Sequence, residues 1–349
     1  MKIEVYSPTI RRKEMDAVLT AMVQDRVGPG ELARSLVQIA KDHIQFDYCL
    51  ALRSPAIALS LALRALNLGD GAGVLVSALS PRYYRQVLEE LRLTPVYCDV
   101  PSGSAVMSAE TAAAALEKTG GNPVPRCIVV NHTLGFVPDT AALCALGLPV
   151  IEDCSQSYGT NVGEQRAGSF GALAILGLEE RDMLTAGGGA LLYAVNRRDA
   201  GALRALSPLP EYSLPDLNAA MAIAQFRESA RNLEKRKLMG EAYIHPALRT
   251  RHKVFVQGET AEKQSIEYNY YAFPLILETG MKDVKAYAKK KDIIVENAFD
   301  ETIVGSGSIP PELCAEAYSL SLRTALFPLY PRLTGAETEK VAKLILTLP

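Results

Sequence analysis

The chain lacks the features that mark several specialised classes of protein. Among its 349 residues no apolar run approaches the ~18–20 residues needed to span a bilayer. The opening residues, MKIEVYSPTI, do not show the basic-then-apolar pattern of a signal peptide. A net charge of −2 argues against nucleic acid or an anionic membrane surface as the main partner. We therefore expect a cytoplasmic protein that binds neither nucleic acid nor membranes.

Metal-binding spacings are also missing. The six cysteines are scattered without a CxxC pair, and most of them fall in apolar, strand-like runs. His43, His245 and His252 have no carboxylate or cysteine partner at ligand spacing. The sequence therefore predicts reduced, buried thiols and no metal site.

Lysine is absent from the middle of the chain. No lysine occurs between Lys118 and Lys235, so an amine nucleophile would have to come from outside this stretch. The stretch includes the segment PVIEDCSQSYG, residues 149–159, and a glycine triplet at 187–189. A strand rather than a helix is expected after the triplet, which indicates a tight turn and not a dinucleotide-binding loop.

What is present is an alternation of short apolar strands with amphipathic helices. The strands are nearly continuous apolar runs, as expected when both faces of a parallel sheet are covered. The pattern predicts an α/β domain with a mainly parallel sheet. The predicted strands are Tyr48–Leu52, Val74–Ser77, Val96–Val100, Cys127–Asn131, Val150–Asp153, Ala172–Gly177 and Ala190–Ala194, and the predicted helices are Ala56–Leu66, Tyr84–Leu91, Ser108–Lys118 and Thr140–Leu146.

The pattern changes after a proline-rich turn at residues 208–215. A long helix is predicted over Asp216–Lys237, followed by a smaller α+β segment. We place the domain boundary at residue 235, which gives domains 1–235 and 236–349, with an N-terminal arm packing against the second domain. In the second domain the predicted strands are Tyr270–Leu277 and Ile293–Glu296, and the predicted helices are Lys282–Lys291 and Glu337–Leu346.

Polar residues follow two of the predicted strands. Asp153 ends one strand and Gln156 comes three residues later. Ligands of such sheets bind at the carboxyl ends of strands. There a carboxylate could hold a protonated ring nitrogen and an amide could bond a ring oxygen, although such an Asp is as often a helix cap. His132, after another strand, is either a site residue or a buried histidine with satisfied hydrogen bonds.

Seven segments, in order, carry a likeness to a known family. They are VGPGELARSLVQIAKDH (27–43), GVLVSALSPRYYRQVLEELRLTPVYCDV (73–100), VNHTLGF (130–136), PVIEDCSQSYG (149–159), FGALAILGLEERDMLTAGGGA (170–190), LPDLNAAMAIAQF (214–226) and FPLYPRLTGAETEKV (327–341). With these segments the chain resembles the DegT/DnrJ/EryC1/StrS family of pyridoxal-phosphate-dependent sugar aminotransferases. The resemblance implies an aspartate-aminotransferase-like α/β large domain with a seven-stranded sheet, a smaller α+β C-terminal domain, a homodimer, and pyridoxal phosphate as cofactor.

The resemblance also implies which residues form a remnant of the cofactor site. Asp153 and Gln156 fall on the ring contacts, Ser54 falls in the phosphate-binding turn, and His132 falls close to the cofactor. The family's phosphate-binding serine falls on Gly177 or on the residue after it, depending on where a one-residue deletion lies.

Other family residues are replaced. The Schiff-base lysine falls on Arg181, and a guanidinium cannot take over its chemistry. Pro55 removes a backbone N–H from the phosphate turn, Pro81 replaces the stacking aromatic, and Glu211 replaces an asparagine that reaches the phosphate from the partner subunit. The resemblance thus implies no catalytic lysine and weak or absent binding of pyridoxal phosphate.

Three arginines could serve a different ligand. Arg53, Arg82 and Arg181 would line a surviving cleft and suit an anion. The alternative that we favour is structural, with Arg53 and Arg181 forming ion pairs with Asp153 or Glu211.

These losses favour a catalytically degenerate homologue that binds a nucleotide sugar or pairs with an active paralogue. Two alternatives stay open. A sugar aminotransferase of polysaccharide or antibiotic sugar biosynthesis could use a displaced lysine, such as Lys235 or Lys237. A dehydratase or lyase could use pyridoxamine phosphate. The sequence identifies neither the sugar nor a protein partner.

Overall fold

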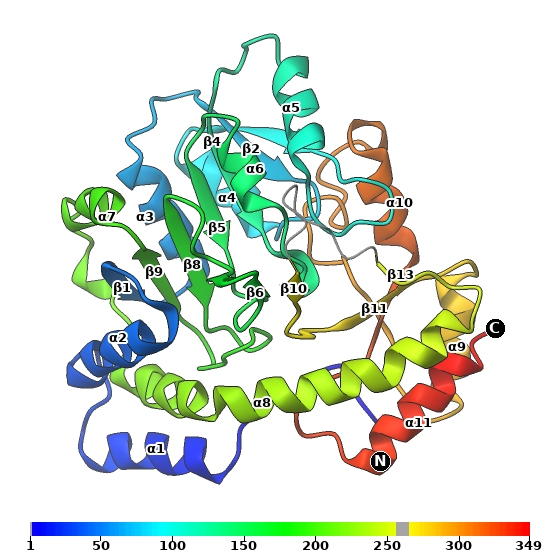
Figure 1. The fold of residues 1–349 in the computed structure, drawn as a ribbon. Helices are drawn as coiled ribbons and strands as arrows, with labels where there is room; N and C mark the ends of the chain where they lie inside the picture. Colours follow the sequence, from blue (N-terminus) through cyan, green and yellow to red (C-terminus); the bar gives the residue numbers. More distant parts are fainter. Residues whose placement is uncertain (1, 256–264) are drawn as a thin grey trace.

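The computed structural model describes residues 2–255 and 265–349. Its central feature is a seven-stranded sheet in the order β1-β9-β8-β5-β4-β2-β3 (Figure 1). Neighbouring strands from β3 to β8 are parallel, and β9 is antiparallel to both β8 and β1. The mainly parallel α/β sheet is therefore confirmed. The strands are β1 (Tyr48–Leu52), β2 (Gly73–Ser77), β3 (Thr94–Cys98), β4 (Pro125–Asn131), β5 (Val150–Asp153), β8 (Leu173–Gly177) and β9 (Ala190–Ala194).

Helices cover both faces of this sheet. Alternate residues of a strand face opposite sides: Ile151 and Ile175 pack in the cluster that includes α3, α4 and α7, whereas Ala174 and Leu176 pack against α2 and α8. Because helices cover both faces of the sheet, the strand sequences are continuous apolar runs. The helices are α2 (Glu31–Ile44), α3 (Pro55–Ala65), α4 (Tyr83–Glu90), α5 (Ala109–Lys118), α6 (Thr140–Cys144), α7 (Arg197–Arg204) and α8 (Asp216–Leu248).

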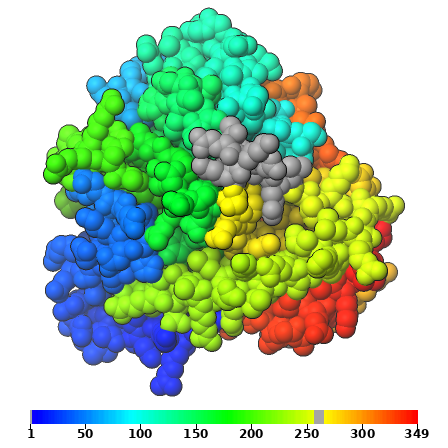
Figure 2. All heavy atoms as spheres, viewed as in Figure 1, coloured from blue at the N-terminus to red at the C-terminus, as the bar shows by residue number. Residues whose placement is uncertain are grey.

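Helix α8 is longer than predicted. It continues for 33 residues, past the expected end at Lys237, and tolerates Pro246 in its last turn. Figure 2 shows it as a yellow-green band across the lower part of this face, with N-terminal residues in blue below one end and C-terminal residues in red below the other. The boundary placed at residue 235 falls inside this helix, and the division into domains 1–235 and 236–349 stays a prediction.

The N-terminal arm packs against the second domain, as predicted, only in part. Its helix α1 (Arg12–Val23) lies on the first half of α8, where Gln225 Nε2 donates to Glu14 Oε1 at 3.0 Å. Contacts with the second domain come from Ile3, which forms a bridge with Ile293, and from Arg11, which donates to the carbonyl of Pro331. The arm therefore contacts both the first half of α8 and the small unit.

The C-terminal part forms a small α+β unit. Its sheet has the order β11-β13-β12. The strand predicted at Ile293–Glu296 is wrong in position: β12 begins at Glu296, and Ile293 forms only the single bridge to Ile3. The elements are β11 (Phe273–Ile276), β12 (Glu296–Asn297), β13 (Thr324–Phe327), α9 (Met281–Lys289), α10 (Ala315–Arg323) and α11 (Gly335–Leu346).

A third, small sheet joins the two parts. It has the order β10-β6-β7, with β6 (Asn161–Val162) and β7 (Gln165–Arg166) forming a hairpin that follows β5, and β10 (Ile266–Glu267) coming from the C-terminal part. The described residues contain no helix long and apolar enough to cross a bilayer. In the same residues no group of His, Cys, Asp and Glu could hold a metal ion.

Candidate functional site

The predicted site residues converge at the carboxyl edge of the large sheet. Asp153 at the end of β5 is in register with Asn131 at the end of β4 and with Ile175 in β8. Parallel strands end at one edge, so His132, Asp153 and Gly177 are brought to the same region. We call the surface formed around Asp153, Ser155 and Gly177 the floor.

The Asp153 carboxylate is already fully engaged by the protein. Its Oδ2 accepts hydrogen bonds from the hydroxyls of Tyr84, at 2.6 Å, and Tyr83, at 3.3 Å. Its Oδ1 accepts from the backbone N–H and the hydroxyl of Ser155. Asp153 is 2% exposed, so these donors replace the water that the charge loses. Burial, and then the charge of Asp153, raise the pKa of both tyrosines.

Gln156 and Ser54 are also engaged within the protein. Gln156 Oε1 accepts from the backbone N–H of Leu134 at 2.6 Å and so fixes the turn after β4, where Leu134 has a left-handed conformation. Ser54 is the N-cap of α3, and its hydroxyl accepts from the N–H of Ile57 at 3.2 Å. Both contacts support local backbone structure.

His132 is a buried residue that contacts other side chains of the protein, and it does not face an open site. Its Nδ1 lies 2.6 Å from Ser157 Oγ, and its Nε2 lies 3.4 Å from Glu152 Oε2 without forming a hydrogen bond. Glu152 in turn accepts backbone N–H groups of Gly168, Phe170 and Gly171. His132 and Glu152 are both 0% exposed, so a bound ligand would not reach them.

Gly177 lacks a side chain for a steric reason. Its N–H donates to Ser155 Oγ at 2.7 Å. A Cβ placed here would lie 2.2 Å from Asp182 Oδ2 and 2.7 Å from Ser155 Oγ, both far inside normal contact distance. The space beside Gly177 is therefore filled by the Asp182 carboxylate.

Arg181 points away from the floor. Its side chain is 59% exposed, its Nη1 lies 2.9 Å from Glu296 Oε2, and its guanidinium lies over the ring of Tyr6 at 5.7 Å. The expected pairing with Asp153 or Glu211 is therefore wrong, although a structural ion pair does form. The partner comes from β12 in the small unit, which sequence spacing could not reveal.

The other arginines of the expected anion cleft are also tied to the protein. Arg82 pairs with Glu301 at 3.0 Å. Arg53 donates through Nε to the backbone carbonyl of Glu211 rather than to its carboxylate. With Arg181 paired as well, none of the three side chains is free of a protein partner.

Asp182 is the site residue that the sequence did not reveal. It lies against Gly177 and accepts a hydrogen bond from the N–H of Glu179 at 2.8 Å. Burial, followed by the charges of Asp153 and Glu179, raises the pKa of Asp182 to about 7. The family's lysine position was expected at Arg181, the preceding residue, and the structure shows that it is the side chain of Asp182 that meets Gly177.

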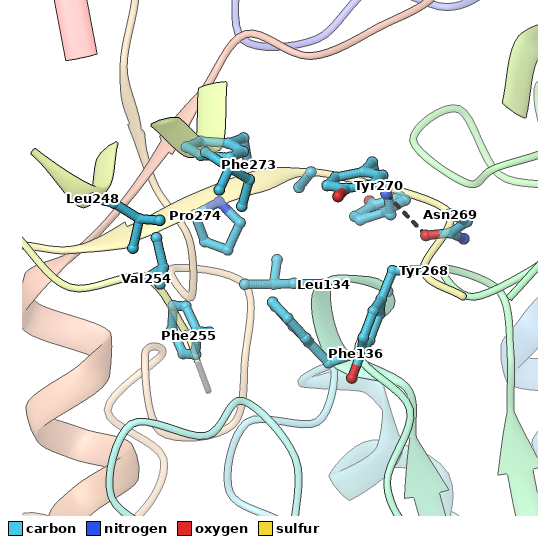
Figure 3. A pocket seen from close by; sticks show the side chains of 14 residues that line it. Leu134, Phe136, Leu248, Val254, Phe255, Tyr268, Asn269, Tyr270, Phe273 and Pro274 are labelled. Atoms are coloured by element: carbon cyan, nitrogen blue, oxygen red, sulfur yellow. Dashed lines mark hydrogen bonds between the residues drawn. The ribbon is translucent and has the colours of Figure 1, made fainter. Parts of the chain in front are cut away.

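An apolar cavity of about 300 Å³ is lined in part by Leu134 and Asn269, both of which are hydrogen-bonded to Gln156 (Figure 3). Leu134 and Phe136 form one wall, Tyr268 stands edge-on to Phe136, and Val254 and Phe255 lie across from them. Asn269 in the wall is held by hydrogen bonds to the carbonyls of Gln156 and Tyr158. Its described lining residues include no charged side chain, so the cavity suits apolar ring faces and offers no counter-charge to a diphosphate.

Comparisons of the whole fold find structures described as aminotransferases. An aminotransferase from Psychrobacter cryohalolentis superposes with a TM-score of 0.86, covering 97% of this chain and 96% of that one at 18% identity. A DegT DnrJ EryC1 StrS aminotransferase from Brucella abortus gives 0.85 over 95% and 94% at 19% identity. A sugar aminotransferase from Micromonospora echinospora gives 0.83 over 99% of both chains at 16% identity. At these identities the likeness establishes the aspartate-aminotransferase-like fold.

Sequence comparison identifies the family. An L-glutamine:2-deoxy-scyllo-inosose aminotransferase from Streptomyces fradiae is 29% identical over 181 residues, which are 50% of this chain and 41% of that protein. The chain thus spans less than half the length of that relative. The sequence pattern of one family matches residues 8–346, nearly the entire chain. The protein belongs to the DegT/DnrJ/EryC1/StrS aminotransferase family.

Proposed function

We propose that this family member is catalytically degenerate, a homologue of sugar aminotransferases that no longer transfers amino groups. The observation that carries the proposal is the exchange at the floor. Asp182 lies beside Gly177, Arg181 is paired with Glu296, and no lysine occurs between Lys118 and Lys235. A carboxylate cannot supply the amine that the family reaction requires.

The residues present do not fit pyridoxal phosphate, and we propose weak or absent binding. The cofactor would supply an electron sink through its ring, but the groups expected to hold it are engaged elsewhere. Both oxygens of Asp153 are bonded by tyrosine and serine donors, and Ser54 caps its own helix. A cofactor that took the place of these donors would have to supply new hydrogen bonds to the buried carboxylate of Asp153. Without them, the loss costs free energy.

A displaced lysine has little support. Lys235 Nζ donates to the carbonyl of Pro331 at 3.3 Å, in the second domain. Lys237 lines a surface cavity beside Glu234 and Glu267 rather than the floor. Family membership still keeps an aminotransferase or a pyridoxamine-phosphate-dependent dehydratase as the alternative, since a related fold from Streptococcus pneumoniae, described as a candidate sugar aminotransferase, has pyridoxal phosphate bound.

The retained role that we propose is binding, as a cytoplasmic homodimer or paired with an active paralogue. A nucleotide sugar is the ligand that the family suggests. The aromatic cavity of Figure 3 could receive its ring groups, because Phe136 and Tyr268 offer flat apolar surfaces.

A cofactor-retention assay and a ligand screen test this function. The protein is incubated with pyridoxal phosphate, desalted, and examined for cofactor absorbance, while nucleotide sugars are screened in parallel for thermal stabilisation. Degeneracy predicts no retained absorbance. Absorbance that survives desalting without a covalent bond would instead support the dehydratase or lyase, and a bound cofactor with turnover of an amino donor would support the aminotransferase.

A further inference from the structure

A second cavity, of about 280 Å³, lies on the side of the sheet away from the Tyr84–Asp153 contact. It is surrounded by α2, the β6–β7 hairpin and α8 (Figure 1). Its inner wall includes Leu176 and Tyr193, which belong to the apolar cluster of α2 and α8. Asp153 contacts α4 on the opposite face, so this cavity is separate from the floor.

The cavity contains a cationic side chain without a counter-charge. Arg166 on β7 is exposed, and none of the ion pairs within residues 2–255 and 265–349 includes it. Other arginines of the site regions, such as Arg82 and Arg181, are paired with carboxylates. Its charge reaches the far wall: burial and then Arg166 lower the pKa of His43, whereas burial raises the pKa of Tyr158 and the Ser229 hydrogen bond and Arg166 act against that rise.

A chain of hydrogen bonds fixes the orientation of His43. Ser229 Oγ donates to the carbonyl of Phe226 at 2.7 Å, and the Tyr158 hydroxyl donates to Ser229 Oγ at 3.2 Å. The Tyr158 oxygen can then accept from His43 Nδ1, which lies 3.3 Å away. When Nδ1 carries the hydrogen, Nε2 carries the lone pair of the neutral ring, and it can donate to an anion only after it has taken up a proton.

We propose that this cavity binds a small organic anion, with a carboxylate or phosphate head between Arg166 and His43 and an apolar body against Leu176 and Tyr193. The head would supply the counter-charge that Arg166 lacks, through charge-assisted hydrogen bonds. The apolar inner wall favours an organic group over a bare ion. The site is independent of the proposed loss of aminotransfer.

The experiment uses three matched probes: benzoate, phenyl phosphate and the neutral benzyl alcohol. Binding is followed by thermal stabilisation and by the NMR signal of the His43 imidazole, which is tractable because the chain has 4 histidines. At least one anion should bind and raise the pKa of His43, whereas benzyl alcohol should not. Burial and then Arg166 lower this pKa, and Asp42 raises it, so the added anion acts in the same direction as Asp42. Benzoate alone, or phenyl phosphate alone, would identify the head group.

The substitution R166Q provides the decisive comparison. It should weaken anion binding about tenfold or more, which corresponds to one charge-assisted contact. R126Q is the control, since Arg126 is another exposed strand arginine, at the start of β4 and outside the cavity. Equal affinity of R166Q and the parent protein, or no anion effect on the His43 signal, would overturn the proposal.

Discussion

The hydroxyl of Tyr84 lies 2.6 Å from Oδ2 of Asp153, so a side chain of α4 occupies the acceptor that the family resemblance assigned to a cofactor ring. Tyr84 is 0% exposed and Asp153 is 2% exposed. The two groups form a closed polar contact that was built by the chain itself. We expect this contact to act in stability rather than in ligand binding.

Removing that hydroxyl should therefore destabilise the protein. Y84F leaves a lone pair of a buried carboxylate without its donor, and we expect a loss of about 1–3 kcal/mol in the free energy of unfolding. Urea unfolding measures it. Y83F is the matched control, because its 3.3 Å contact is longer and its loss should be smaller. Equal stability of Y84F and the parent protein would contradict the role given to this contact.

Asp182 should make stability depend on pH. Its pKa is about 7 in the folded protein against 3.8 ordinarily, so between these values the folded state binds more protons than the unfolded state. The stability contributed by the protonated form is complete below pH 3.8 and is lost as the pH rises toward 7. D182N should flatten this slope, and D16N, on exposed helix α1, should not. Urea unfolding at several pH values measures this dependence. If the pH dependence of stability in D182N were the same as in the parent protein, Asp182 would not be its source.

Gly177 and Asp182 should be coupled. G177A places a methyl group 2.2 Å from Asp182 Oδ2, and overpacking of this kind costs about 1–3 kcal/mol. In a D182A background the same substitution should cost less, because the carboxylate is gone. G201A serves as control, since no atom lies within 4 Å of a Cβ at that position. If the losses of stability in the double-mutant cycle were additive, the proposed coupling between Gly177 and Asp182 would be wrong.

The Arg181–Glu296 pair should contribute little to stability. The Arg181 side chain is 59% exposed, and exposed ion pairs are worth about 0–1 kcal/mol. R181Q and E296Q should therefore unfold nearly like the parent protein, and their small losses should shrink further in high salt. A loss of several kcal/mol from either variant would show that the pair holds the small unit in place.

Much of the fold followed from the sequence because its strands are buried on both faces. Continuous apolar runs located all seven strands of the large sheet within two residues. Short strands were harder: β12 is only Glu296–Asn297, and its partner β13 carries most of the apolar signal. Helix α8 extends beyond its predicted end at Lys237. Helix α11 packs against α8, and residues of α8 after Lys237 are still buried.

The site was predictable in position and not in its contacts. Asp153 and Gln156 lie after β5 as expected, because the end of a strand fixes where its next residues go. Their partners come from distant segments: Tyr84 from α4 and Leu134 from the turn after β4. Arg181 and Asp182 are adjacent, and only the direction of each side chain shows which one meets the floor.

The variants R181K and D182K extend this distinction to chemistry. An amine at position 182 would stand beside Gly177 and Asp153, whereas one at 181 would stand near Glu296. After treatment with pyridoxal phosphate and borohydride, the adduct at the introduced residue should be larger in D182K than in R181K, and it should stay well below one per chain because the groups expected to hold the cofactor remain engaged. A specific adduct on R181K would show that residue 181, rather than residue 182, occupies the position of the family's lysine.

The most direct test of the loss of aminotransfer is borohydride trapping on the unmodified protein. The chain is incubated with pyridoxal phosphate, reduced, and digested, and each lysine peptide is examined for the added mass. We predict no lysine modified above the level found with a surface-lysine control protein. Stoichiometric modification of one lysine, such as Lys235 or Lys237, would contradict the account and favour the aminotransferase alternative.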